Sequence, residues 1–240
     1  CNAQNVGINT SAPRFPLSFN INNGDKISLY DDGNPAEVHF GIGIASNQLL
    51  QIHSATLFDD IAFGYGNSIT FTEWMRIKGN GKIGIGTNTP VARLHVADSN
   101  VLFSASAVLP PTPGSPPIEG GGRRMMWYAD KAAFRAGIAF GNQWDKDSMG
   151  LISIALGNST KAKGESSFAS GWNTSALALA STAMGINSMA AGNYSTAIGV
   201  SSNASGENAV SIGTFAKSPG FSSLAMGYNT TASGFYSTAL

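Results

Sequence analysis

The chain has 240 residues, enough for one or two domains, and 29 of them are glycine. Charged residues make up only 12% of it, and 14 basic residues against 14 acidic ones give a formal net charge of zero. This balance predicts no nucleic-acid partner and no charged lipid surface as a partner, and no apolar stretch approaches the roughly 18 residues that span a bilayer.

Cys1 is the single cysteine of the sequence, so the chain forms no internal disulfide. Cys1-Asn2-Ala3 has the small-x-Ala form that precedes signal-peptidase cleavage, which would make Gln4 the mature start. Alternatively, Cys1 is a lipidated first residue. Both interpretations predict export, to the outside or the outer surface of a Gram-negative bacterium, and the signal peptide is the favoured one.

A long repeat opens the chain, because Val6-Gly-Ile-Asn-Thr-Ser-Ala-Pro13 is echoed by Ile83-Gly-Ile-Gly-Thr-Asn-Thr-Pro90. Each copy alternates small and apolar residues, turns at Thr-x-x-Pro and alternates again. This pattern predicts two strands joined by a tight turn in each copy. The first copy begins in the segment 1–13, and the second forms a module over residues 83–106.

Short strand patterns with turn residues between them fill the space between the copies, and they predict a small β-domain over residues 14–82. The expected strands are Lys26–Tyr30, Val38–Ile44, Leu49–His53, Ile61–Tyr65, Ser68–Trp74 and Met75–Lys78. The expected turns are Asp31-Asp-Gly-Asn, Gly64-Tyr-Gly-Asn and Gly79-Asn-Gly-Lys.

Residues 107–122, AVLPPTPGSPPIEGGG, predict a linker or strapping loop. The aromatic-rich segment 123–150 follows, and two interpretations of it stay open. The favoured one is a β-cap that starts the repeats and shields their open edge. The other is a ligand surface on which Trp127, Tyr128 and Trp144 stack against sugars.

The last ninety residues, 151–240, follow the unit S-x-A-x-G-x-x. The repeat glycines are Gly157, Gly164, Gly171, Gly185, Gly192, Gly199, Gly206, Gly213, Gly220, Gly227 and Gly234, with Ala178 in the one missing place. Eleven glycines, each costing about 1 kcal/mol in a helix, exclude a coiled coil, and their spacing excludes collagen. The pattern predicts a solenoid in which S-x-A-x is a strand with small residues inside and each Gly takes a positive-φ corner.

The residue before each repeat glycine is bulky in alternate units, which predicts coils of fourteen residues with one irregularity around Ser170–Leu177. The bulky residues form a predicted stripe along one face: Leu156, Met184, Ile198, Ile212, Met226 and Leu240. An interior of Ala and Ser buries little apolar area, so it stabilises a single solenoid only weakly. The exposed apolar stripe in addition needs another surface to cover it. Three copies around an axis supply one, so we expect an elongated homotrimer.

Units such as Ser181-Thr-Ala-Met-Gly185 and Ser195-Thr-Ala-Ile-Gly199 resemble the head repeats of trimeric autotransporter adhesins. The resemblance implies a left-handed parallel β-roll, packed as a trimer, that binds host matrix or other surfaces. The V-G-I-G-T-x-x-P motif with Arg93-Leu-His-Val96 resembles bacterial surface-fibre and phage tail-fibre-like proteins. In those proteins a C-terminal intramolecular chaperone domain drives trimerisation, and the sequence up to Leu240 contains none.

No pattern in the chain predicts catalysis, a cofactor or a metal. His39, His53 and His95 are far apart in sequence with no Cys or carboxylate at ligand spacing, and His95 is the one candidate for a trimer-axis site. Paired acids such as Asp59-Asp60 predict solvated turns rather than Ca²⁺ sites. Asp147-Ser148-Met149 resembles the O-glycosylation motif of some exported proteins, which makes Ser148 a possible modified residue.

The sequence therefore predicts a non-enzymatic, all-β, trimeric extracellular fibre segment that acts as an adhesin, with a glycan, matrix or cell-surface ligand. The alternative is a purely structural fibre or filament component that contacts secretion or assembly machinery. A third possibility, a polysaccharide-degrading spike, would need a pair of carboxylates between subunits. Asp145, Asp147 and Glu165 are the candidates for such a pair.

Overall fold

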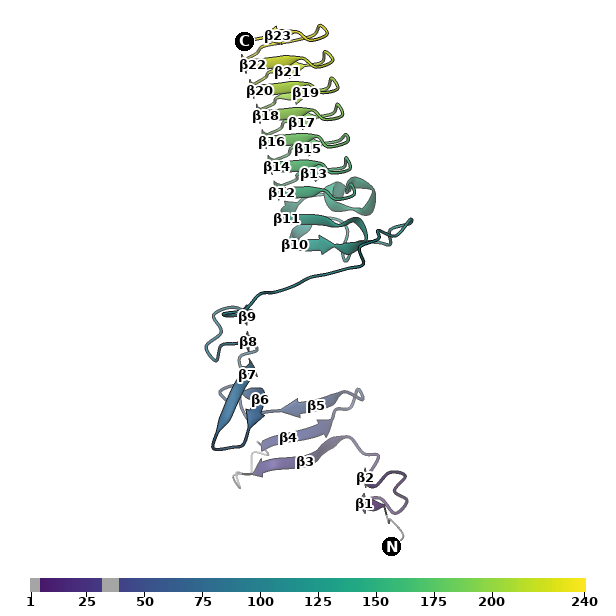
Figure 1. The fold of residues 1–240 in the computed structure, drawn as a ribbon. Helices are drawn as coiled ribbons and strands as arrows, with labels where there is room; N and C mark the ends of the chain where they lie inside the picture. The colour runs from purple at the N-terminus through teal and green to yellow at the C-terminus, as the bar shows by residue number, and fades with distance from the viewer. Residues whose placement is uncertain (1–4, 32–38) are drawn as a thin grey trace. The chain divides into compact units, whose positions relative to one another are not determined.

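The computed structural model describes residues 5–31 and 39–240, and Cys1, with its predicted cleavage or lipidation, lies outside the described residues. The chain divides into two compact units, Cys1–Leu102 and Phe103–Leu240. Both are built of strands (Figure 1). Across the described residues the helices are three-residue 3-10 turns, and none of them could cross a membrane.

The first unit contains three small sheets, β1-β2, β3-β4-β5 and β6-β7-β8-β9. Their strands are β1 (Val6–Ile8), β2 (Leu17–Phe19), β3 (Gly24–Asp31), β4 (His39–Ile44), β5 (Leu50–His53), β6 (Ile61–Gly66), β7 (Phe71–Ile77), β8 (Ile83–Ile85) and β9 (Leu94–Val96). The strand predictions of this region are confirmed except at two places. Gly64–Gly66 continues β6 rather than turning, and Ser68–Lys78 yields one strand, β7, instead of two.

The two copies of the long repeat adopt the same structure, which differs from the expected tight turn. β1 pairs with β2 in parallel, Val6 opposite Leu17, and β8 pairs with β9 in parallel, Ile83 opposite Leu94. Parallel neighbours need a longer connection than a hairpin, so the segment containing Thr-x-x-Pro is a wide loop. Because β8 also pairs with β7, the expected boundary at residue 82 falls inside one sheet.

An ion-pair cluster holds the β6-β7-β8-β9 sheet of this unit at the Gly79–Lys82 turn. The Asp60 carboxylate accepts hydrogen bonds from Arg76 at 2.8 Å, from Lys78 at 2.9 Å and from the Gly79 backbone at 3.2 Å. The hydrogen bond from Lys78 is the largest of the effects that hold the pKa of Asp60 below its ordinary value. The cluster fixes the ends of β6 and β7 to the turn before β8.

The second unit is a β-solenoid. One nine-stranded sheet has the order β10-β11-β12-β14-β16-β18-β20-β22-β23, and a second sheet contains β13-β15-β17-β19-β21 (Figure 1). The strands of the first sheet are β10 (Gly122–Tyr128), β11 (Ala133–Ala139), β12 (Ile154–Asn158), β14 (Phe168–Trp172), β16 (Thr182–Ile186), β18 (Thr196–Val200), β20 (Val210–Thr214), β22 (Leu224–Tyr228) and β23 (Thr238–Ala239). Those of the second are β13 (Lys161–Ala162), β15 (Ser175–Ala176), β17 (Met189–Ala190), β19 (Asn203–Ala204) and β21 (Lys217–Ser218).

Strand register confirms the fourteen-residue coil. Ala155 pairs with Ala169, Ala169 with Ala183 and Ala183 with Ala197, and the second sheet has the same step between Ala162 and Ala176. The coil phase stays constant through Ser170 and Leu177, because Ser170 pairs in register with Leu156 and Met184. The irregularity in the sequence is therefore a substitution in the stripe and not a shift of the chain.

The interior of the coils is a column of alanine flanked by serine and threonine, as the alternation predicted. The repeat alanines from Ala155 to Ala204 are fully buried. Ser153, Ser167, Ser195 and Ser223 are buried too, and each hydroxyl donates to the carbonyl oxygen three residues earlier at 2.6–2.7 Å. These bonds satisfy hydroxyl groups that would otherwise be costly to bury.

One coil exchanges the two interior residue types, with alanine at 209 and 216 and serine at 211 and 218. The exchange keeps the hydroxyls hydrogen-bonded. Ser211 Oγ donates to the Ala216 carbonyl at 2.7 Å, and Ser202 Oγ, one coil earlier, donates to the Ser211 carbonyl at 2.8 Å. The interior therefore tolerates either order of Ser and Ala, since both are small and each hydroxyl finds a carbonyl.

The corners of the coils are formed by residues other than the repeat glycines, contrary to the prediction. A left-handed residue, with φ between 50° and 58°, stands two places after each repeat glycine, and the row runs from Ser159 to Tyr236 in steps of seven. These residues are Ser, Asn, Ala, Tyr and Phe rather than glycine. Each corner N–H donates to the coil below, as Ser166 does to Leu151 and Tyr194 to Leu179 at 2.8 Å, which offsets the cost of the left-handed conformation.

The repeat glycines instead allow the coils to stack closely. Gly206 has no positive φ, but a Cβ built on it would overlap the carbonyl oxygen of Gly220 in the next coil. Gly199 has φ of 130° and the same kind of overlap with Gly213. Close backbone approach is thus the common reason for glycine, and the positive φ belongs to one of the two glycine rows only.

Candidate functional sites

The sheet β3-β4-β5 brings together three side chains that can bind a metal. Asp25 lies on β3, His39 begins β4 and His53 ends β5. Asp25 is opposite Gly43, and His53 is opposite Gly41. Directly opposite residues of antiparallel strands share a face, and so do residues 39, 41 and 43 of one strand. The register therefore gathers all three side chains on one face of the sheet.

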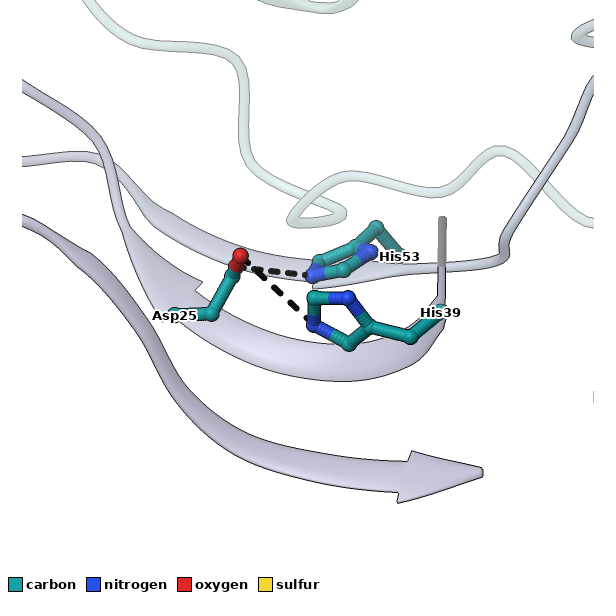
Figure 2. Close-up of side chains that lie close together, drawn as sticks. All are labelled: Asp25, His39 and His53. Carbon is teal, nitrogen blue, oxygen red and sulfur yellow. Dashed lines mark hydrogen bonds and ion pairs between the residues drawn. The ribbon is translucent and has the colours of Figure 1, made fainter. Parts of the chain in front are cut away.

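Both imidazoles face the same carboxylate (Figure 2). His53 Nε2 lies 3.1 Å from Asp25 Oδ1, and His39 Nε2 lies 3.5 Å from Asp25 Oδ2. The two rings meet edge to face, with centroids 5.0 Å apart and planes at 75°. One ligand atom from each residue lies within 4.8 Å of the others. The His39 side chain is 14% exposed and that of Asp25 is 51% exposed, so the cluster is open to solvent on the carboxylate side.

Two buried glycines of the central strand make room for this cluster. A Cβ on Gly41 would lie 2.6 Å from the Ile27 carbonyl oxygen and 2.9 Å from the His39 ring, and a Cβ on Gly43 would lie 2.7 Å from Asp25 Oδ1. A larger residue at Gly43 would displace the Asp25 side chain, and one at Gly41 would displace the His39 ring and the backbone of β3. The pattern His39-x-Gly41-x-Gly43 of β4 therefore leaves room for the cluster and for close pairing with β3.

Sequence spacing predicted no histidine site within one chain, and the strand pairing brings together residues that this spacing separates. His39 and His53 are far apart along the chain, but strand pairing makes them neighbours with Asp25. The available signal was the alternation of His39 with two glycines in a predicted strand. His95 lies on β9 of a different sheet and is not part of the cluster, and its place on a trimer axis stays a prediction.

Two of the three aromatic residues that were candidates for a sugar-binding surface lie in the core of the cap. Tyr128 and Trp144 are buried with Met126, Ala133, Ala139 and Met149 in one cluster. Trp144 is fully buried, and its indole N–H donates to the Thr160 carbonyl at 2.9 Å. Tyr128 donates its hydroxyl proton to the Gly114 carbonyl. Neither ring can stack on a ligand, because both belong to the core of the cap.

Trp127 is the one of the three aromatic candidates that remains accessible, at 39% exposure. It lines a shallow, mostly apolar pocket together with Phe103, Pro117, Ile118 and Met125. The pocket joins the Pro/Gly segment to the cap strand β10. A flat ring in such a pocket is suited to stacking on an apolar face of a ligand.

The cap closes the end of the solenoid. β11 pairs in parallel with β12, and β10 pairs antiparallel with β11, so β10 forms the edge of the sheet. Arg135, in register with Ala155, is fully buried and donates to the carbonyls of Ser153 at 2.8 Å and Ala162 at 3.0 Å. Burial lowers the pKa of Arg135 to about 10, so the guanidinium stays charged at neutral pH and binds the carbonyls at the base of the coils.

Short polar contacts tie the Pro/Gly segment to the cap. The Asp130 carboxylate accepts from the Gly114 N–H at 2.7 Å, and that of Asp145 accepts from the Gly120 N–H at 2.6 Å. The segment is thus strapped to the cap over these residues. Asp145, considered as a possible catalytic acid, has a structural role in this contact.

Ser148, the residue predicted as a possible modification site, is buried. Ser148 ends the 3-10 turn η3 (Lys146–Ser148) and is 6% exposed. The other two turns of the cap are η1 (Ala129–Lys131) and η2 (Asn142–Trp144). A glycosyltransferase cannot reach this hydroxyl in the folded chain.

The predicted stripe exists as a row in the nine-stranded sheet. Register aligns Leu156, Ser170, Met184, Ile198, Ile212 and Met226 on successive strands. Two residues earlier on each strand a second row contains Ile154, Phe168, Thr182, Thr196, Val210 and Leu224. Both rows face away from the buried alanines, because side chains alternate along a strand. The apolar face is therefore two rows wide on β12, β20 and β22 and one row wide on β14, β16 and β18, where the sequence indicated one row throughout.

Comparison with known proteins identifies the repeats. The YadA head domain repeat, described as two copies of the unit, matches residues 153–174, 176–202, 190–216 and 218–240. No curated protein matches the chain. The matched residues coincide with the solenoid strands from β12 to β23. The C-terminal solenoid of this chain is therefore similar to YadA head domain repeats over most of its length.

Proposed function

We propose that the chain is a segment of a bacterial surface fibre that assembles as a homotrimer and acts as an adhesin. The observation that carries the proposal is the solenoid of YadA head domain repeats over residues 153–240. The head repeats imply a surface-exposed position and self-association, and export through a signal peptide fits the same role.

The apolar face of the solenoid supports assembly. Ile154, Met184 and Met226 are each more than a third exposed in the single chain, although they lie in the two apolar rows. A largely apolar face on a fibre surrounded by water needs a cover, and a closed ring of identical chains supplies it.

The first unit supports assembly independently. Where the structure describes burial within residues 5–102, the buried residues are Gly41, Gly43, Gly84 and Pro90, so no bulky apolar side chain is buried. Large apolar side chains such as Ile69, Phe58 and Phe15 are at least 70% exposed. A domain of this size ordinarily needs a core, a metal or an oligomer to stay folded.

Light scattering over a range of concentrations tests the assembly. We expect a stable mass three times the 24.8 kDa of one chain. Replacing both Ile198 and Ile212 by aspartate should dissociate the trimer, because it would place buried, unpaired carboxylates in the apolar interface.

Ser205→Asp is the matched control for that experiment. Like Ile198 and Ile212, Ser205 stands directly before a repeat glycine, but it belongs to the alternate units outside the apolar stripe, and it is exposed. It should leave the mass unchanged. A mass of 24.8 kDa for the unsubstituted chain at every concentration would contradict the trimer.

Retention of the assembled protein on arrays of glycans and matrix proteins tests the adhesin role. We expect retention on at least one surface, and Trp127→Ala to weaken it by about three- to tenfold, the effect of losing one aromatic stacking contact. Phe140→Ala is the control, because Phe140 is 72% exposed but lies outside the Trp127 pocket. Absence of retention, with recovery of assembly or secretion components alone, would favour a purely structural fibre, and release of sugars would indicate an enzyme.

A further inference from the structure

The Asp25, His39 and His53 cluster has the donor chemistry of a transition-metal site. Two imidazole nitrogens and one carboxylate oxygen suit Zn²⁺ and related divalent ions, and zinc sites with three protein ligands keep a further position for water. The exposed side of Asp25 leaves that position open to solvent.

The observed spacings fit one ion bound by all three residues. In a tetrahedral site with metal–ligand distances of 2.0–2.1 Å, ligand atoms lie about 3.4 Å apart. The two nitrogen–oxygen distances of the cluster are 3.1 Å to Asp25 Oδ1 and 3.5 Å to Asp25 Oδ2, and one ligand atom from each residue lies within 4.8 Å of the others. Both imidazole rings point toward the Asp25 carboxylate, so the three ligand groups converge on one place (Figure 2).

The glycines beneath the cluster favour a metal over a simple ion pair. Gly41 and Gly43 lie in the central strand of the sheet, where glycine weakens a strand. A His–Asp pair that is half open to water adds little to the stability of the fold. Metal coordination stabilises a small domain far more strongly than such a pair does.

The position of the cluster gives the ion a structural task. Its three ligands come from three different strands, β3, β4 and β5, so one ion would link every strand of the sheet. Neither face of that sheet buries a bulky apolar side chain among the described residues. Small domains with too little core commonly use a metal in this way.

From these observations we infer that Asp25, His39 and His53 bind one Zn²⁺-class divalent ion per chain and that the ion stabilises the β3-β4-β5 sheet. All three ligands belong to one chain, so the site does not depend on the proposed trimer or its ligand.

Co²⁺ titration of the full chain, followed by displacement with Zn²⁺, tests the inference. Cys1→Ser is used as the background, because a free thiol is itself a metal ligand. We expect one Co²⁺ per chain with visible d–d absorption, loss of that absorption on adding Zn²⁺, and a rise in the melting temperature of the first unit with Zn²⁺. His39→Gln and His53→Gln should each weaken binding by at least about tenfold.

His95→Gln is the matched control, since His95 lies on another sheet, and it should bind Co²⁺ like the background protein. Asp25→Asn keeps the size of the side chain while removing its charge, so it should weaken binding without unfolding the sheet. Absence of saturable Co²⁺ and Zn²⁺ binding, or equal binding by the His39→Gln/His53→Gln double variant, would overturn the inference and leave an ion pair.

Discussion

Replacing Gly206 by alanine is expected to lower the free energy of unfolding of the solenoid by about 2–3 kcal/mol. Gly206 is buried and has no positive φ, so its backbone conformation suits alanine. The new Cβ would overlap the Gly220 carbonyl oxygen of the next coil, and backbone on both sides must move. Denaturant unfolding followed by circular dichroism measures the loss.

Two further alanine variants of the 240-residue chain separate close approach from backbone conformation. Gly234→Ala is the control, because its Cβ would meet nothing closer than 3.5 Å and its φ is not positive, so we expect little change. Gly227 has φ of 107° with no atom closer than 3.6 Å, so Gly227→Ala should cost about 1–3 kcal/mol from strain alone. If Gly206→Ala were as stable as Gly234→Ala, close stacking would not be the reason for the repeat glycines.

Trp144→Ala is expected to lower the free energy of unfolding by about 3–5 kcal/mol, the range for removing a large buried aromatic ring. Trp144 is fully buried in the cap and donates to the Thr160 carbonyl of the first coil. Its removal would leave a cavity where the cap joins the solenoid, and the Thr160 carbonyl would lose this hydrogen bond. Because coils are stabilised by their neighbours, we also expect faster proteolysis of the first coils.

Trp172→Ala is the matched control, since Trp172 is 57% exposed on the outer surface of β14. It should change the free energy of unfolding by no more than about 0.5 kcal/mol in a single chain. Equal losses for the two variants would show that the cap core around Trp144 does not stabilise the solenoid.

The sequence predicted the solenoid well because its information is local and repeated. Each coil places alanine and serine at fixed positions, and each position has the same surroundings in the next coil, from Ala155 through Ala197. A single coil carries little information, but the shared register of many coils leaves one arrangement that buries every alanine.

Glycine in a repeat has two physical explanations that the sequence cannot separate. A positive φ and a close backbone approach both select it, and Gly199 has both features whereas Gly206 has the close approach alone. The left-handed corners carry residues as large as Tyr194 and Phe215, because hydrogen bonds between coils offset the strain. Composition at those positions therefore gave no sign of a corner.

The sequence also could not predict whether the paired strands of the first unit run parallel or antiparallel. Alternation of small and apolar residues around Val6 and Leu17 is the same for a hairpin and for a parallel pair. The length of the loop and the pairing of β8 with β7 decide between them, and both are tertiary features.

By itself the sequence determined the all-β class, the fourteen-residue coil, its small-residue interior and the position of its apolar stripe, because each follows from the period of neighbouring side chains. Only the tertiary structure decided that Tyr128 and Trp144 form the core of the cap and that His39 and His53 meet Asp25. Burial and side-chain proximity depend on which strands pair and in which register, and those contacts join residues that are distant in the chain.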